Sequence, residues 1–266
     1  MNGMKIFDLS GRVALVTGAG SGLGRAFSES LAEFGADIVC VGRTEQKLME
    51  TVDLVGRFGH RAIAVKADVS KPVDVDYMVE EAVAKLGTVD ILVNNAGINH
   101  IPTRIGETSI EDWNRVIDIN LTGVFLCMRA VLSVMLREKR GSVINIASIG
   151  AFGGSTPPVT PASYGASKAG IIALTKFAAV EYAKDGIRVN CIAPGFHKTD
   201  LGLPSDSNLA KQREQKLEKL ISRIVPLGRP GQPIEIKGLA VFLASEASSF
   251  VTGQVFIQDG GQLAQI

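Results

Sequence analysis

Two hydrophobic periods alternate along the chain. Short runs rich in β-branched residues are typical of buried strands, while longer stretches with apolar residues three and four positions apart are typical of helices. Strands are predicted at residues 12–17, 37–41, 62–65, 91–93, 142–147, 187–192 and 256–258. Helices are predicted at residues 24–34, 43–59, 72–86, 109–137 and 164–184. The chain is thus a regular succession of strands and helices.

This succession predicts an α/β fold. Strands that alternate with helices form a parallel sheet covered on both faces, because right-handed crossovers carry each helix back over the sheet. No linker-like stretch divides the 266 residues, so we expect a single domain over residues 1–266, with a Rossmann-type, doubly wound sheet in three layers. Ligands of such sheets bind at the carboxyl ends of the strands, and the polar motifs of this chain fall there.

A glycine-rich turn joins the first predicted strand to the first predicted helix. It carries Gly18, Ser21, Gly22, Leu23 and Gly24. Glycine permits a positive φ and lets backbone amides approach a pyrophosphate, whose charge the N-terminus of a helix favours. The spacing Gly-x-x-x-Gly-x-Gly differs from the strict G-x-G-x-x-G fingerprint. Its position predicts a dinucleotide-binding turn, and a simple tight corner is the alternative.

The second predicted strand ends at Gly42-Arg43, where an NAD-dependent enzyme usually carries an acid for the ribose hydroxyls. An arginine can instead bind a 2′-phosphate through two hydrogen bonds. We therefore expect NADP as the preferred cofactor, with NAD as the other possibility. A solvated surface arginine is the alternative reading of Arg43, and Ser21 stands where a second basic residue would strengthen the case.

Tyr164 and Lys168 lie four positions apart on a predicted helix, so they share one helix face. A free tyrosine has a pKa of about 10, and a nearby cation lowers that value. The pair is therefore expected to act as a proton shuttle, with Ser148 holding a carbonyl or alcohol oxygen at the phenol. On an exposed helix the same spacing would be only structural.

Taken together, the motifs resemble those of the classical short-chain dehydrogenase/reductase family, over nearly the whole chain. The resemblance implies one Rossmann-type domain with a seven-stranded parallel sheet. It also implies an NAD(P)-dependent oxidoreductase that interconverts a ketone and a secondary alcohol. The motifs that carry it are Gly18/Gly22/Gly24, Asn94-Asn95-Ala96-Gly97, Asn120, Ser148, Tyr164/Lys168, Pro194-Gly195 and Asp259-Gly260-Gly261.

The resemblance assigns roles to individual residues. The implied catalytic set is Asn120, Ser148, Tyr164 and Lys168. The implied cofactor contacts are Gly18, Ser21, Gly22, Leu23, Gly24, Arg43, Asp68, Val69, Asn94, Ala96, Gly97, Tyr164, Lys168, Pro194, Gly195, His197 and Thr199. Asp68-Val69 would meet the adenine and Lys168 the nicotinamide ribose. Asn120 would hold a water that relays protons from Lys168, and the segment after Pro194 would contact the nicotinamide and its carboxamide.

Two features depart from the family pattern. The interval from Ser148 to Tyr164 is longer than usual, and its residues 155–161 include three prolines, which stiffen a loop. This insert is either a shaped wall of the substrate site or an inert surface insertion. His197 stands where relatives often carry an apolar residue, and His100 follows the Asn-Asn-Ala-Gly motif. Neither histidine is predicted to be catalytic.

The substrate is not fixed by the sequence. A capping segment at about residues 198–225 is polar and of mixed charge, which is typical of a solvated helix face and also suits a polar or acidic substrate. Two substrate classes stay open: a 3-oxoacyl thioester, and a sugar, sugar acid or polyol. The alternative function is a catalytically silent NAD(P)-binding regulator or scaffold, which would have no chemical reason to keep the whole catalytic set.

Composition excludes several other functions. A net charge of +1 gives no electrostatic footprint for nucleic acid. The three cysteines, Cys40, Cys127 and Cys191, are scattered without the spacing of a metal site or a disulfide framework. There is no basic segment followed by a long apolar one near Met1, and no run of eighteen apolar residues. We expect a cytoplasmic protein with no metal, no membrane and no nucleic-acid partner.

The helices predicted from Ser109 and Tyr164 carry apolar residues around much of their circumference. A helix that covers one face of a sheet needs only one apolar stripe, so the excess predicts a second partner. In the family these two helices pair with their symmetry mates. The apolar residues of the C-terminal stretch 256–266 would provide a second two-fold interface, and two such axes give a homotetramer.

Overall fold

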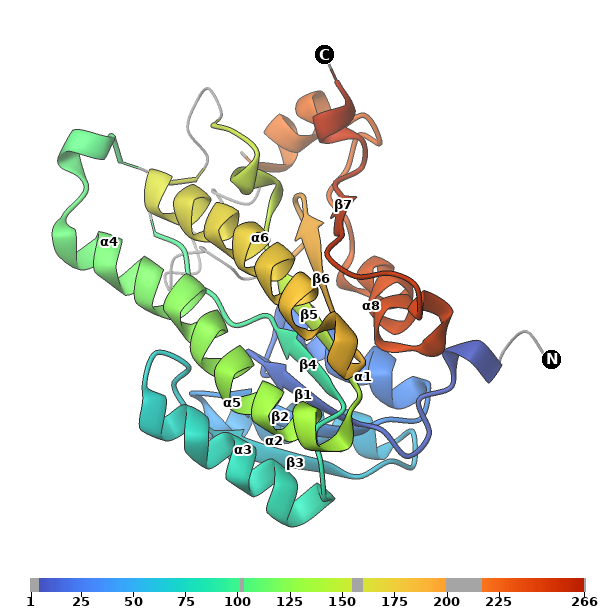
Figure 1. Ribbon diagram of the computed structural model, residues 1–266. Helices are drawn as coiled ribbons and strands as arrows, with labels where there is room; N and C mark the ends of the chain where they lie inside the picture. The colour runs from blue at the N-terminus through green and yellow to red at the C-terminus, as the bar shows by residue number, and fades with distance from the viewer. Residues whose placement is uncertain (1–4, 101–102, 155–159, 200–216, 266) are drawn as a thin grey trace.

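The protein is built on one seven-stranded parallel sheet (Figure 1). The computed structural model describes residues 5–100, 103–154, 160–199 and 217–265. The strands are β1 (Val13–Thr17), β2 (Asp37–Gly42), β3 (Ala62–Lys66), β4 (Ile91–Asn94), β5 (Gly141–Ile146), β6 (Ile187–Pro194) and β7 (Val255–Gln258). Their order in the sheet is β3-β2-β1-β4-β5-β6-β7, with every pair parallel. The predicted doubly wound fold is confirmed.

Helices cover both faces of this sheet. The helices are α1 (Gly22–Glu33), α2 (Glu45–Gly56), α3 (Pro72–Leu86), α4 (Ile110–Ile117), α5 (Gly123–Glu138), α6 (Ala162–Tyr182) and α8 (Lys237–Ala244). Figure 1 shows α3, α5 and α6 on the near face and α1 and α8 on the far face. Each face has its own buried apolar cluster, one containing Met78 and Ile171 and the other Phe27 and Leu243. Five consecutive buried residues in β1 follow from this double coverage.

The predicted long helix at residues 109–137 is interrupted. It consists of α4, a π-helical stretch at Asp118–Thr122, and α5. A π-helical stretch has a looser i→i+5 bonding pattern and often marks a functional site. Hydrophobic periodicity did not predict it, because one extra residue in a turn barely changes the apolar stripe. The prediction also missed α8, which is apolar at nearly every position and therefore has no clear helical period.

The helical span Ile110–Glu138, which comprises α4, the π-helical stretch and α5, is the one span in the described part of the chain that is long and apolar enough by composition to cross a membrane. Its most apolar window is 56% buried inside the protein. The buried side chains of α5 belong to the cluster that packs against the sheet. The core helix of a folded domain meets the same criteria of length and composition, so packing against the sheet accounts for this helix.

Two predicted features fall largely outside the described residues. Most of the proline-containing insert, at residues 155–159, is outside them, while Thr160 and Pro161 are described. Of the predicted capping segment, residues 198–199 and 217–225 are described, and residues 217–224 are helical. The residues that precede these two gaps follow the carboxyl ends of β5 and β6, where we expected the ligand site.

Candidate active site

The glycine-rich turn between β1 and α1 requires glycine for backbone reasons. Gly18 and Gly22 adopt positive φ values of 67° and 53°. A Cβ atom on Gly24 would collide with the carbonyl oxygen of Gly18. A Cβ on Gly18 would lie 2.8 Å from Nδ2 of Asn95. Side chains at these positions would therefore fill the concave side of the turn or force its backbone into another conformation.

The start of α1 fits a pyrophosphate. Its N-cap residue, Ser21, makes no side-chain cap hydrogen bond, and no acidic residue lies in the first turn. The positive end of the helix dipole and the first backbone N–H groups are thus not neutralised by side chains of this turn. An anion is favoured at such a helix start, and the glycines let it approach the backbone. The residues present therefore fit the dinucleotide cofactor that the sequence predicts.

Side chains from α1 and α2 hold the carbonyl groups of this turn in place. Thr51, which is completely buried, donates from Oγ1 to the Ala19 carbonyl at 2.9 Å. Arg25 donates to the Gly20 carbonyl at 2.8 Å, to Oγ1 of Thr51 at 3.1 Å and to Oε2 of Glu50 at 2.7 Å. The sequence analysis missed this clamp, because no motif links residues that are 26 positions apart.

The opposite side of the turn is tied to the loop after β4. Asn95 donates from Nδ2 to the Thr17 carbonyl at 2.9 Å, and the backbone N–H of Ala96 donates to Oγ1 of Thr17 at 3.0 Å. The Asn94 side chain instead lies in the sheet, where it donates to Oδ1 of Asn145 at 2.9 Å. Asn94 therefore steadies the sheet through its side chain, and Asn95 and Ala96 position the turn.

Arg43 and Asp68 follow the ends of the neighbouring strands β2 and β3. Arg43 is exposed. The pKa of Asp68 lies below its ordinary value: burial opposes the shift, but hydrogen bonds from Ser70 and the charges of Arg43 and Lys71 outweigh it. Val69 points the other way, because a Cβ on Gly123 would lie 2.9 Å from its Cγ2. Asp68 and Arg43 thus form a charged rim while Val69 packs into the core.

The structure brings Ser148, Tyr164 and Lys168 together at the carboxyl end of β5. Tyr164 and Lys168 lie on α6 and are 7% and 4% exposed, with the Lys168 ammonium 5.6 Å from the centroid of the Tyr164 ring. Nζ of Lys168 donates to the Ile146 carbonyl at 2.8 Å. Oγ of Ser148 accepts from the backbone N–H of Gly150 at 3.1 Å, and the Ser148 hydroxyl lies near enough to the Tyr164 phenol to act on its pKa. Three groups from one strand end and one helix therefore share a small buried space.

Burial controls the ionisation of the tyrosine and the lysine. The prediction that Lys168 lowers the pKa of Tyr164 is wrong here: burial raises the Tyr164 pKa, and the hydrogen bond with Ser148 only partly opposes that effect. Burial lowers the pKa of Lys168 to about 8. Both shifts have one cause, because a poorly solvated site disfavours the phenolate and the ammonium alike.

Asn120 lies on the π-helical stretch and is completely buried. Its amide holds the loop after β4: Oδ1 accepts from the backbone N–H of Ile98 at 2.8 Å, and Nδ2 donates to the Ile98 carbonyl at 3.0 Å. A Cβ on Gly97 would lie 3.4 Å from Oδ1 of Asn120 and 3.6 Å from Nζ of Lys168. The π-helical stretch therefore places Asn120 on the same side of this loop as the lysine.

The loop after β6 begins at Pro194 and packs tightly against neighbouring loops. A Cβ on Gly195 would lie 2.7 Å from Cα of Asp259. Nδ1 of His197 lies 3.2 Å from the Gly195 carbonyl oxygen, and burial lowers the pKa of this histidine. A Cβ on Gly231 would lie 2.8 Å from two atoms of the His197 ring. The ring of His197 therefore packs between loops.

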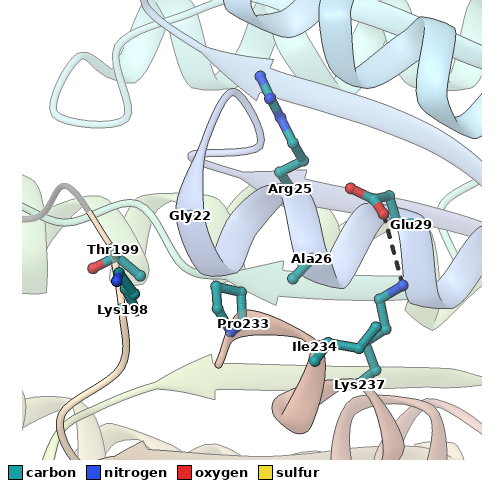
Figure 2. A pocket seen from close by; sticks show the side chains of 9 residues that line it. All are labelled: Gly22, Arg25, Ala26, Glu29, Lys198, Thr199, Pro233, Ile234 and Lys237. Atoms are coloured by element: carbon teal, nitrogen blue, oxygen red, sulfur yellow. Dashed lines mark ion pairs between the residues drawn. The ribbon is translucent and has the colours of Figure 1, made fainter. Parts of the chain in front are cut away.

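Further along this loop, Thr199 faces the glycine turn. A Cβ on Gly22 would lie 3.3 Å from Cγ2 of Thr199. Between them opens a pocket of about 310 Å³, with α1 on one side and the loop bearing Lys198 and Thr199 on the other (Figure 2). An ion pair between Glu29 and Lys237, at 3.7 Å, lines this pocket at the right of the view. Two predicted cofactor residues, Gly22 and Thr199, thus form facing walls of one pocket.

His100 connects the loop after β4 with α6, the helix that carries Tyr164. Its Nε2 lies 3.0 Å from Oγ of Ser163, the buried residue that precedes Tyr164. The sequence analysis assigned His100 no role. The contact shows that it helps to fix the start of α6 against the loop that follows Gly97.

Comparisons with known proteins cover the whole of this arrangement. A family model described as enoyl-(acyl carrier protein) reductase matches residues 18–262. A 3-oxoacyl-[acyl-carrier-protein] reductase from Synechocystis sp. is 40% identical over 258 residues, which cover 96% of this chain and 98% of that protein. A 2-dehydro-3-deoxy-D-gluconate 5-dehydrogenase from Dickeya dadantii is 39% identical over 263 residues, covering 98% of this chain and 99% of that protein.

A solved structure is similar over the full length. The crystal structure of a gluconate 5-dehydrogenase from Burkholderia cenocepacia in complex with NADP and tartrate has a TM-score of 0.89 and 35% identity, covering 100% of both chains. All these similarities span both the glycine-turn half and the Tyr164 half of the site, so they concern the complete domain.

Proposed function

The chain belongs to the classical short-chain dehydrogenase/reductase family and is an NAD(P)-dependent oxidoreductase that interconverts a ketone and a secondary alcohol; we propose that Ser148, Tyr164, Lys168 and Asn120 perform its chemistry with NADP as the preferred cofactor. The observation that carries this proposal is the convergence of Oγ of Ser148 and the buried Tyr164 ring beside Gly150, with the buried ammonium of Lys168 5.6 Å from the centroid of that ring. Nothing in the fold requires these polar groups to meet in a poorly solvated space, whereas proton transfer to a substrate oxygen does.

The residues divide the reaction between them. The cofactor, when bound, donates a hydride to the ketone carbon or accepts one from the alcohol carbon. Ser148 and Tyr164 both place a hydroxyl at the substrate oxygen, and Tyr164 gives this oxygen its proton in the reducing direction and removes it in the oxidising direction. A neutral phenol, which burial favours, is the form that donates. Lys168 supplies positive charge beside the phenol, and Asn120 fixes the Ile98 carbonyl nearby.

The preference for NADP rests on Arg43. No carboxylate in the described part of the chain lies within ion-pair distance of the Arg43 guanidinium. Asp68 is nevertheless near enough for the charge of Arg43 to lower its pKa. An arginine fork binds a phosphate through two parallel hydrogen bonds. The Burkholderia gluconate 5-dehydrogenase was crystallised with NADP, which supports the same choice for this chain.

Two substrate classes follow from the relatives. One is a 3-oxoacyl thioester, as the name of the Synechocystis reductase indicates, and the other is a sugar acid or polyol, as the gluconate enzymes indicate. The sequence identities to these two relatives, 40% and 39%, are too similar to favour one substrate class over the other. The alternative of a catalytically silent NAD(P)-binding regulator is disfavoured by the complete catalytic set.

We also propose a cytoplasmic homotetramer. Four large side chains on α5 and α6 are apolar and exposed: Phe125 at 48%, Leu136 at 39%, Phe177 at 76% and Val180 at 82%. Such residues on the outer side of sheet-covering helices favour contact with a second copy of the chain. The free, buried cysteines are consistent with a reducing compartment. Sedimentation velocity at micromolar concentration tests the assembly, and a single monomeric species would contradict it.

A screen of ketones and alcohols against NADPH, NADH and their oxidised forms, followed by cofactor absorbance, tests the function. We expect turnover of at least one member of the two substrate classes, with a higher kcat/KM for NADP(H). Binding of cofactor without turnover of any member, by a protein whose Tyr164→Phe variant behaves identically, would favour the silent regulator.

A further inference from the structure

One point beside Oγ of Ser148 and the Tyr164 ring holds no side chain, although the fold does not require it to be empty. It is the position that a Cβ atom on Gly150 would occupy, which is 3.5 Å from Oγ of Ser148, 3.7 Å from Oγ1 of Thr160 and 3.8 Å from Cδ1 of Tyr164. These are ordinary van der Waals distances, and the φ of Gly150 is not in the positive region. An alanine would therefore fit there, so neither the backbone nor packing demands a glycine.

Thr160 is held in place at this point. It precedes Pro161, and a residue before proline is restricted to extended conformations. Pro161 is the N-cap of α6, and its carbonyl accepts from the backbone N–H groups of Tyr164 and Gly165 at 3.1 and 3.2 Å. The Thr160 backbone is thus attached directly to the N-cap of the helix that carries Tyr164.

The hydroxyl of Thr160 is half-buried and has no hydrogen bond to any group in the described ranges. A Cβ atom on Gly150 would lie within 4 Å of Oγ of Ser148 and of Oγ1 of Thr160, so the Thr160 hydroxyl faces the same space as the Ser148 hydroxyl. A partly buried hydroxyl gains most from a hydrogen-bonding ligand group, because leaving it unpaired costs free energy.

We propose that Thr160 binds an oxygen on the substrate carbon next to the reacting carbon, on the side of Gly150 where a Cβ atom would point. This inference rests on the proposed function, since it takes Ser148 and Tyr164 as the groups that hold the reacting oxygen. It selects between the two substrate classes. A polyol or sugar acid carries a hydroxyl on the adjacent carbon, whereas the adjacent carbons of a 3-oxoacyl thioester are methylene groups. The substrate is accordingly polyhydroxylated.

The test compares two ketones that differ by one hydroxyl on the adjacent carbon, hydroxyacetone and acetone, with NADPH. Acetoacetyl-coenzyme A serves as the thioester probe and 5-oxo-gluconate as the sugar-acid probe. For the wild type we expect a higher kcat/KM for hydroxyacetone than for acetone, and for 5-oxo-gluconate than for the thioester. Thr160→Val, which removes the hydroxyl but keeps the shape, should lower the hydroxyacetone-to-acetone ratio by about tenfold. Thr160→Ser should restore it.

Gly150→Ala provides an independent arm. Its methyl group would occupy the open point, so the same ratio should fall because the adjacent-carbon hydroxyl no longer fits. Gly154→Ala is the matched control: it lies in the same loop with open space around its Cβ position, and it should leave the ratio unchanged.

Three results would overturn the inference: equal rates with hydroxyacetone and acetone in the wild type, a ratio unaffected by Thr160→Val, or a preference for acetoacetyl-coenzyme A over 5-oxo-gluconate. In all three the enzyme still turns over ketones, so the proposed function stands. An absence of turnover with all four probes, together with no activity in the broader screen, would instead count against the proposed function itself.

Discussion

The two halves of the site are built in opposite ways. In the cofactor half, side chains from other elements engage the backbone carbonyls of the glycine turn: Asn95 bonds Thr17, Thr51 bonds Ala19, and Arg25 bonds Gly20. In the substrate half, the hydroxyls of Ser148 and Thr160 and the Tyr164 ring surround one open point, with Lys168 buried behind them.

This difference separates recognition from chemistry. The cofactor half is organised by the chain's own hydrogen bonds, so it presents a fixed backbone shape and a helix terminus to an anion. The substrate half presents polar groups to the reacting atoms. Substitutions in the first half should therefore act mainly on the affinity for cofactor, and substitutions in the second should act mainly on kcat.

The largest effect is expected from Tyr164→Phe. Removing the phenolic proton donor should lower kcat by roughly 10²–10⁴, the range of general acid–base catalysis. Cofactor affinity, measured by the fluorescence of bound NADPH, should change little because the glycine turn is untouched. Tyr77→Phe, at a tyrosine that is 48% exposed on α3, is the matched control. A Tyr164→Phe variant with more than a tenth of the wild-type kcat would refute the proton-transfer role.

The next effect concerns the outer edge of the cofactor half. Arg43→Asp should lower the ratio of kcat/KM for NADP over NAD by roughly 10- to 100-fold, because a hydrogen-bonded charge contributes about 1.5–3 kcal/mol. A carboxylate repels the 2′-phosphate and can accept from ribose hydroxyls. Arg57→Asp, at the C-cap of α2, introduces the same charge change away from the turn. An unchanged ratio in the Arg43 variant would show that this arginine is only a surface residue.

The positions of the strands along the chain and the glycine turn were predictable from the sequence because both depend on local information. Buried strands appear as β-branched runs, and the residues of a turn are consecutive. Asn120 was assigned through family resemblance, but its place on a π-helical stretch was not visible, since periodicity does not register one extra residue in a turn.

Other features could not be predicted because they depend on tertiary packing. The clamp formed by Arg25 and Thr51 joins two helices, and the open point at Gly150 exists only where the loop after β5 meets the start of α6. The predicted lowering of the Tyr164 pKa was wrong for a related reason. Spacing places a lysine beside a tyrosine, but it does not give the burial that outweighs the charge.

The Arg25 clamp offers a finer test of the cofactor half. Arg25→Met should raise KM for NADP and NAD alike by about five- to tenfold, because the Gly20 carbonyl and Thr51 lose hydrogen bonds worth about 1 kcal/mol. The effect on kcat at saturating cofactor should be smaller. Arg25→Lys should recover part of the loss, since an ammonium reaches one acceptor but lacks the guanidinium fork. A lower melting temperature with unchanged KM values would mean that the clamp only stabilises the fold.

The last prediction concerns the buried ammonium of the substrate half. Burial lowers the pKa of Lys168 to about 8, below its value of 10.5 in an unfolded chain. Between these two values the unfolded state binds a proton that the folded state does not, so this lysine makes stability rise with pH. Below pH 8 both states are protonated, and the full cost of burying the charge is present.

Lys168→Met removes this titration but leaves the other groups in place. The free energy of unfolding of the wild type, minus that of the variant, should therefore rise between pH 8 and pH 10. A pKa difference of one corresponds to about 1.4 kcal/mol, so urea denaturation at pH 7.5 and 9.5 should detect the change. Tyr164, whose raised pKa acts with the opposite sign above pH 10, is present in both proteins and largely cancels. If the difference between the two free energies of unfolding were constant across this range, the Lys168 ammonium would be solvated. The contrast between a hydrogen-bonded cofactor half and a poorly solvated substrate half would then not hold.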